Sequence, residues 1–161
     1  MARILATAGG AGYAPIAPGT FGSALGVLVF VILSALHPLL FLLTTATLLA
    51  LGTWASDRAE AFFGKKDDGR IVIDEVVGQL IALTPLLFCA ELAGTRLIAS
   101  LGAGFLLFRL FDIWKPGPVA WAERRFEGGA GVMLDDVAAG ALAALFTAPL
   151  ALFCSAQGAT P

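Results

Sequence analysis

Charge is scarce in this sequence. Asp, Glu, Lys and Arg make up 14% of its 161 residues, whereas 58% are hydrophobic. Soluble globular domains contain about 25% charged and about 45–50% apolar residues, and the mean hydropathy of +0.88 departs from them in the same direction. We therefore expect a membrane protein. The formal net charge of −2 argues against nucleic acid as a partner.

Histidine, cysteine and the common catalytic motifs are also nearly absent. The chain contains one histidine, His37, and two cysteines in apolar runs, so we expect neither a disulfide framework nor a metal site built from His or Cys. His37 is interpreted as a loop residue, which leaves no histidine for acid–base catalysis. The sequence has no GxSxG elbow, no Walker loop and no DxD pair.

Four stretches contain no charge: residues 21–55, 76–90, 97–108 and the segment from 137 onward. A membrane-spanning helix needs about 20 apolar residues, and strand signals are absent, so the predicted fold class is all-α, a helical membrane bundle. The first stretch is long enough to cross twice. Proline breaks or kinks helices, so His37-Pro38 predicts two helices of about 14–18 residues, with one kinked helix of about 30 as the alternative. We expect one domain over residues 1–161 with about five short membrane helices.

The basic residues predict an orientation. With a cytoplasmic N-terminus and five crossings, nine of the ten Lys and Arg residues fall inside and only Arg96 falls outside, in agreement with the positive-inside rule. The same topology brings four motifs to interfacial segments on the cytoplasmic face. These motifs are APGTFGS (17–23), IDEVVGQ (73–79), FRLFDIWKP (108–116) and LDDVAAG (134–140).

Two of these motifs begin apolar helices with a pair of acids, Asp74-Glu75 and Asp135-Asp136. Acids in a first turn complement the helix dipole, and that structural interpretation stays open. Grouped carboxylates, however, repel one another unless they are protonated or bridged by a cation. Oxygen ligands alone favour Mg²⁺. Asp67, in the segment KKDDGR, is either a further ligand or part of a solvated turn.

FRLFDIWKP supplies basic residues. Arg109, Asp112 and Lys115 are spaced three apart on one side of a helix end. They indicate either an interfacial helix with snorkelling cations or a phosphate clamp in which Asp112 orients Arg109. The glycines of residues 128–133 predict a flexible loop before the second acid pair. An acid-rich metal site beside basic phosphate ligands indicates metal-assisted chemistry on a lipid phosphate.

Taken in order, APGTFGS, DDGRIVIDEVVGQ, FRLFDIWKPGP and GGAGVMLDDVAAG resemble phosphatidylglycerophosphatase A over nearly the whole chain. The resemblance implies an Mg²⁺-dependent phosphatase of the bacterial inner membrane that removes the terminal phosphate of phosphatidylglycerophosphate. Its partners would be this phospholipid and the bilayer, with the active site on the cytoplasmic face. The family pattern falls on Pro18, Gly19, Thr20, Gly22, Ser23, Asp67, Gly69, Asp74, Glu75, Gly78, Arg109, Asp112, Lys115, Pro116, Pro118, Gly128, Gly129, Gly131, Asp135 and Asp136. Asp57 lies outside it, and Gly117 stands where a bulky aromatic is common.

These patterns assign three sets of residues. The expected metal ligands are Asp67, Asp74, Glu75, Asp135 and Asp136, and the expected catalytic residues are Asp74, Glu75, Arg109, Asp112, Lys115 and Asp136. The expected substrate-binding residues are Gly19, Thr20, Ser23, Arg109 and Lys115. APGTFGS would form a helix cap and anion cradle, or only a helix N-cap.

The expected nucleophile is water, deprotonated by a grouped carboxylate, with a phosphorylated Asp, Thr20 or Ser23 as the competing route. The alternative functions are a phosphatase acting on another lipid phosphate, a structural membrane subunit and a small transporter. A transporter would place its charges near mid-membrane, whereas these charges lie at helix ends.

Overall fold

The computed structural model describes residues 1–89 and 93–156, and these residues form helices without a strand among them. In chain order the helices are α1 (Ala2–Ala6), the 3₁₀ helix η1 (Ala8–Tyr13), α2 (Pro18–Leu33), α3 (Pro38–Phe63), α4 (Ile73–Leu83), the 3₁₀ helix η2 (Thr84–Phe88), α5 (Gly94–Trp114), α6 (Gly117–Arg125) and α7 (Gly128–Ala156). The predicted all-α membrane bundle is confirmed.

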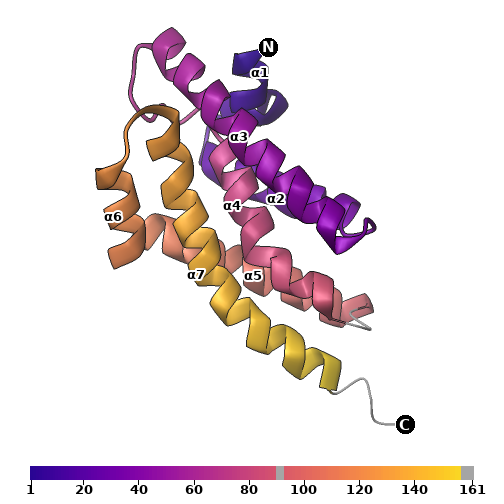
Figure 1. Cartoon of the computed structure of the whole chain (residues 1–161). Helices are drawn as coiled ribbons and strands as arrows, with labels where there is room; N and C mark the ends of the chain where they lie inside the picture. Colours follow the sequence, from indigo (N-terminus) through magenta and orange to yellow (C-terminus); the bar gives the residue numbers. More distant parts are fainter. Residues whose placement is uncertain (90–92, 157–161) are drawn as a thin grey trace.

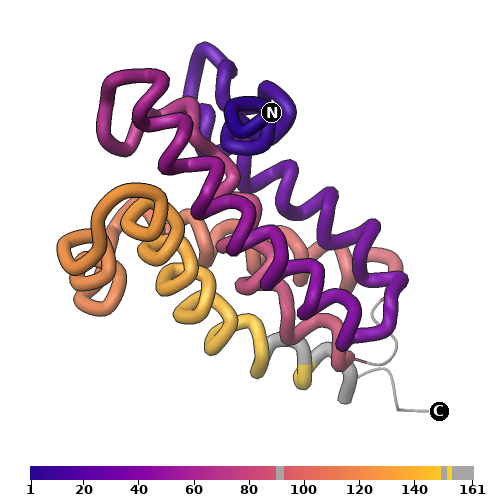
Figure 2. Tube along the Cα trace, turned by 45° about the horizontal axis from the view of Figure 1, so that its top comes forward, coloured from indigo at the N-terminus to yellow at the C-terminus, as the bar shows by residue number. Residues whose placement is uncertain are grey.

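The bundle has two ends. In Figures 1 and 2, α1, the loop after α3, and α6 lie at one end, whereas the connection between α2 and α3 and the end of α7 lie at the other. Within the described residues, three helices are long and apolar enough to cross a membrane: α3, α5, and residues 128–149 of α7. The remaining two predicted membrane segments are shorter, because α2 has 16 residues and α4 has 11. At 1.5 Å per residue, α4 is only about 16 Å long.

The predicted break at His37-Pro38 is confirmed, since α2 ends at Leu33 and α3 begins at Pro38. His37 is the N-cap of α3, and its Nδ1 accepts a hydrogen bond from the Leu39 N–H at 3.2 Å. The predicted length of about 14–18 residues is wrong for α3, which has 26. The prediction ended this helix where its uncharged stretch ends, but charged residues are compatible with a helix. α3 therefore continues to Phe63, and Gly64, with a φ of 67°, is its C-cap.

α4 occupies the centre of the bundle. Nine of its eleven residues are buried, and α2, α3, α5 and α7 pack around it. Glycines permit this close packing: a Cβ atom on Gly140 of α7 would lie 2.4 Å from the carbonyl oxygen of Gly78, and one on Gly26 of α2 would lie 2.7 Å from the Gln79 Cβ. The acidic start of α4 is therefore held between α2 and α7 by backbone contacts.

The predicted flexible loop at residues 128–133 is wrong, because α7 begins at Gly128. A Cβ atom on Gly129 would lie 2.0 Å from the carbonyl oxygen of Thr53, and the Gly129 N–H donates a hydrogen bond to Asp57. Glycine here permits α7 to approach α3. The second acid pair consequently lies in the third turn of α7, where the helix dipole no longer accounts for it.

Candidate active site

Three carboxyl groups from two helices meet beside the centre of the bundle. Asp74 and Glu75 come from the first turn of α4, and Asp136 comes from α7; one oxygen of each lies within 4.8 Å of the others. Asp74 and Asp136 are only 7% and 3% exposed. Asp74 Oδ1, Glu75 Oε2 and Asp136 Oδ2 are buried without a hydrogen-bond partner. Buried acids at this separation require protons or a bound cation.

Glycines of α2 and α4 make room for these carboxyl groups. A Cβ atom on Gly19 would lie 2.2 Å from Glu75 Oε1 and 3.3 Å from Arg109 Nη1, so a side chain at this position would displace the ends of both side chains from the first turn of α2. A Cβ atom on Gly78 would lie 2.8 Å from the carbonyl oxygen of Asp136. The APGTFGS motif therefore shapes the site by leaving space for Glu75 and Arg109.

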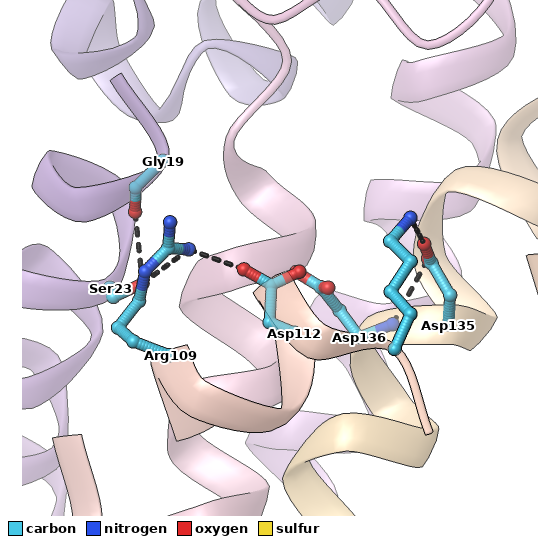
Figure 3. Close-up of polar contacts among 7 residues, drawn as sticks. Gly19, Ser23, Arg109, Asp112, Asp135 and Asp136 are labelled. Atoms are coloured by element: carbon cyan, nitrogen blue, oxygen red, sulfur yellow. Dashed lines mark hydrogen bonds and ion pairs between the residues drawn. The ribbon is translucent and has the colours of Figure 1, made fainter. Parts of the chain in front are cut away.

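Arg109 lies beside the three carboxyl groups. It donates from Nη1 to Asp112 Oδ2 at 2.5 Å and to Ser23 Oγ at 3.4 Å, as Figure 3 shows. Ser23 in turn donates to the carbonyl oxygen of Gly19 at 2.9 Å. The carboxyl groups of Asp112 and Asp136 lie next to each other in the same view. Arg109 is thus fixed at the boundary of α2 and α5, with its side chain still 17% exposed.

Lys115 lies on the other side of the acids. It follows α5 with φ near 48°, and its ammonium group donates to Asp135 at 3.0 Å and to Glu123 of α6 at 2.7 Å. Burial alone would lower the pKa of Lys115, but the two carboxylates outweigh burial and raise that pKa above its ordinary value. Lys115 therefore stays protonated. Arg109 and Lys115, which were expected to form one phosphate clamp, are therefore paired with different carboxylates: Arg109 with Asp112, and Lys115 with Asp135 and Glu123.

Two predicted site residues, Asp67 and Thr20, are exposed. Asp67 is exposed in the loop after α3, where its N–H donates to Glu60 at 2.5 Å; with Asp135 it lines a neighbouring cavity of about 290 Å³. Thr20 is exposed on α2. APGTFGS begins α2, as both interpretations of this motif expect: the N-cap is Ala17, and no side chain caps that helix end.

Three polar residues near the site were not predicted from the sequence. Gln79 is fully buried, and neither its Oε1 nor its Nε2 has a partner. Glu123 binds Lys115, and Asp57 accepts from Gly129. Gln79 did leave a signal, because an amide four residues after Glu75 shares its face in an otherwise apolar helix. Glu123 and Asp57 occur in ordinary polar segments, where no sequence pattern indicates a role in the site.

Comparison with known proteins gives consistent matches. The model of the family described as Phosphatidylglycerophosphatase A matches residues 4–151. Proteins of that name from Escherichia coli K12 and Haemophilus influenzae are 34% identical over 142 residues (88% of this chain, 78% of the relative) and 39% identical over 138 residues (85% and 80%). A Bacteroides thetaiotaomicron protein with the provisional name phosphatidylinositol-3-phosphatase is 42% identical over 142 residues, 85% of each chain. No solved structure matches.

Proposed function

Because the chain belongs to the phosphatidylglycerophosphatase A family, we propose that this phosphatase removes the terminal phosphate of phosphatidylglycerophosphate to give phosphatidylglycerol and inorganic phosphate. The observation that carries the proposal is the buried group of Asp74, Glu75 and Asp136, whose partnerless oxygens lie beside Arg109. A phosphate monoester is an anion, so its approach requires a neutralised acid cluster and a cation to receive it.

The three carboxyl groups fit a divalent cation. They offer only oxygen ligands, and each has a buried oxygen with no partner among the residues that the structure describes; both features suit Mg²⁺. Asp74, Glu75 and Asp136 would hold the ion, and Asp135 and Asp67 would contribute from the neighbouring cavity. When bound, Mg²⁺ supplies positive charge for phosphate oxygens and lowers the pKa of water.

The remaining residues orient the phosphate and move the proton. Arg109, fixed by Asp112 and Ser23, binds non-bridging phosphate oxygens. A carboxylate of the cluster accepts the proton of the attacking water and returns a proton to the phosphatidylglycerol oxygen as its bond to phosphorus breaks. Lys115 holds Asp135 in place. Ser23 is fully buried, with its hydroxyl bonded to both Gly19 and Arg109, which disfavours it as a nucleophile.

Direct attack by water predicts inversion at phosphorus. A chiral thiophosphate substrate in ¹⁸O water measures the stereochemical outcome. Net retention, or a kinetically competent phosphorylated residue, would replace the direct route with a double displacement.

The arrangement of the bundle also supports a cytoplasmic site in the bacterial inner membrane. The segments that carry nine of the ten basic residues lie at the end of the bundle where α4 begins (Figure 1). By the positive-inside rule this end faces the cytoplasm, where a water-soluble product phosphate would leave.

A second substrate has specific support, because one relative carries a phosphatidylinositol-3-phosphatase name. Purified protein should be assayed for phosphate release from phosphatidylglycerophosphate, phosphatidylinositol 3-phosphate and phosphatidic acid, with Mg²⁺ and with a chelator. We expect the highest kcat/KM with phosphatidylglycerophosphate and loss of turnover on chelation, restored by Mg²⁺. Preference for another lipid would correct the substrate alone. No release from any lipid in several detergents would overturn the phosphatase proposal.

A further inference from the structure

A narrow apolar groove lies between α2 and α5. It has a volume of about 270 Å³ and is lined by Ala24, Val27, Leu101, Gly102 and Phe105. We propose that this groove binds an acyl chain of the lipid phosphate whose headgroup lies at Arg109. The inference rests on the proposed lipid phosphatase function and assigns the part of the site that distinguishes a lipid from a soluble phosphate ester.

The face of α5 that borders the groove changes from charged to apolar along its length. Gly102, Phe105 and Arg109 are three and seven residues apart, so they share one face of the helix. Seven residues correspond to about 10 Å along the axis. A phosphate held by Arg109 would therefore place the rest of the lipid over Phe105 and Gly102.

The facing side of α2 has the same order. Thr20 and Ser23 lie near its start, and Ala24 and Val27 follow at helical spacing on the adjoining surface. Ser23 contacts Arg109, so the polar ends of the two faces meet. The groove thus has donors at its headgroup end and only apolar side chains below, which matches the distribution of polarity in a phospholipid.

Two neighbouring glycines of α5, Gly102 and Gly104, differ in the space beside them. A Cβ atom on Gly104 would collide with Leu83 Cδ2 at 2.4 Å, whereas one on Gly102 would meet nothing within 4 Å. Gly104 is buried in helix packing, and Gly102 is exposed. The missing side chain at Gly102 therefore leaves space along the groove without a packing requirement to explain it.

A larger apolar groove of about 730 Å³ lies between α1, α2 and α3, lined among others by Leu25, Val29, Leu48 and Trp54. Its α2 residues lie on a different face from Ala24 and Val27. The described residues that line it include the N-terminal Met1 but no Lys or Arg side chain, whereas the face of α5 along the smaller groove continues to Arg109. This groove is the competing location for the acyl chain.

Substitution at Gly102 tests the proposal. Gly102→Leu should fill the groove and raise KM for a long-chain lipid phosphate about tenfold, with little change in kcat and less than a twofold change for a water-soluble short-chain analogue. Gly102→Ala controls for the loss of glycine, and Ala50→Leu adds the same bulk at an exposed position of α3. Equal effects on both substrates, or no effect on either, would overturn the proposal.

Photolabelling locates the chain directly. A lipid phosphate with a diazirine in its acyl chain should label residues 101–105 of α5, and Gly102→Leu should reduce this labelling severalfold. Labelling confined to residues 48–54 of α3 would place the chain in the other groove and overturn the assignment. An unsubstituted protein that releases no phosphate from either chain length contradicts the proposed function instead, and labelling still tests the groove.

Discussion

The two acid pairs of the site look alike in sequence and differ in structure. Each pair precedes a glycine at helical spacing in an apolar helix. Asp74 and Glu75 both turn into the cluster from the first turn of α4, whereas only Asp136 of the α7 pair joins them. Asp135 is bound by Lys115. The protein thus supplies its own cation to one acid of the second pair, whereas Asp74, Glu75 and Asp136 each keep a buried oxygen without a partner among the described residues.

Neutralising an unpaired acid should have the largest effect on activity. Asp74→Asn and Asp136→Asn should each lower kcat about a hundredfold or more, because under the proposed chemistry each removes a ligand of the bound cation. The melting temperature should be unchanged or higher, since a mutual repulsion is removed. Phosphate release and thermal unfolding in detergent measure the two effects. Asp68→Asn is the matched control, and full activity of both site variants would exclude the cluster.

Breaking the Lys115–Asp135 pair should have a smaller effect. Asp135→Asn and Lys115→Ala should each cost about 10–100-fold, as expected for a group that orients another, with KM raised for Lys115→Ala. The double variant should be little worse than either single variant, because both remove one interaction. Fully additive losses would mean that Lys115 contacts the substrate independently of Asp135. Unchanged kinetics for Lys115→Ala would leave it a snorkelling interfacial lysine.

Gln79 tests whether an unpaired polar group beneath Glu75 is kept for function. Gln79→Leu removes a buried amide without partners, and this should stabilise the fold by about 1 kcal/mol. Turnover should nevertheless fall about tenfold if the amide orders water or Glu75. Chemical denaturation and steady-state kinetics report the two quantities. A variant that is both more stable and fully active would show that Gln79 has no role in the site.

A third acid pair, Asp67-Asp68, provides the contrast outside the bundle and the smallest effect. Asp68 Oδ1 accepts a hydrogen bond from Arg70 Nε at 2.6 Å, and this partner holds the pKa of Asp68 below its ordinary value. Its contribution to stability is therefore present above the unfolded pKa of about 3.9 and is lost as pH falls through the lowered folded pKa. Asp68→Asn should lower the melting temperature slightly at pH 7 and not at pH 2. A difference that persisted at pH 2 would contradict this explanation.

The sequence predicted the elements whose causes are local. Pro38 fixed the start of α3, and Asp74 and Glu75 were placed correctly in the first turn of an apolar helix. The role of the glycines before Asp135 could not be predicted, because it depends on Thr53 and Asp57 of α3, more than 70 residues away. A glycine run favours a flexible loop in isolation and a close helix contact when a partner backbone lies against it.

The residue types of the site could be predicted from the sequence, but the pairing of its charged residues could not. Acid pairs and cations identify the chemistry, yet which cation holds which acid depends on the positive φ of Lys115, which directs its side chain to Asp135 and Glu123. Non-glycine residues adopt such a φ rarely. Helical spacing from Arg109 therefore gave the correct face for Asp112 but not the partner of Lys115.

The contact between Gly78 and Gly140 has a thermodynamic consequence. It fixes α4 and α7 at a separation that brings Asp74 and Asp136 close together. Repulsion between these two carboxylates therefore offsets part of the favourable free energy of packing the two helices. An ion that binds the folded bundle and not the unfolded chain offsets this repulsion and shifts the folding equilibrium by mass action. Under the proposed chemistry, the fraction of folded enzyme would thus depend on the same free Mg²⁺ concentration that sets its rate.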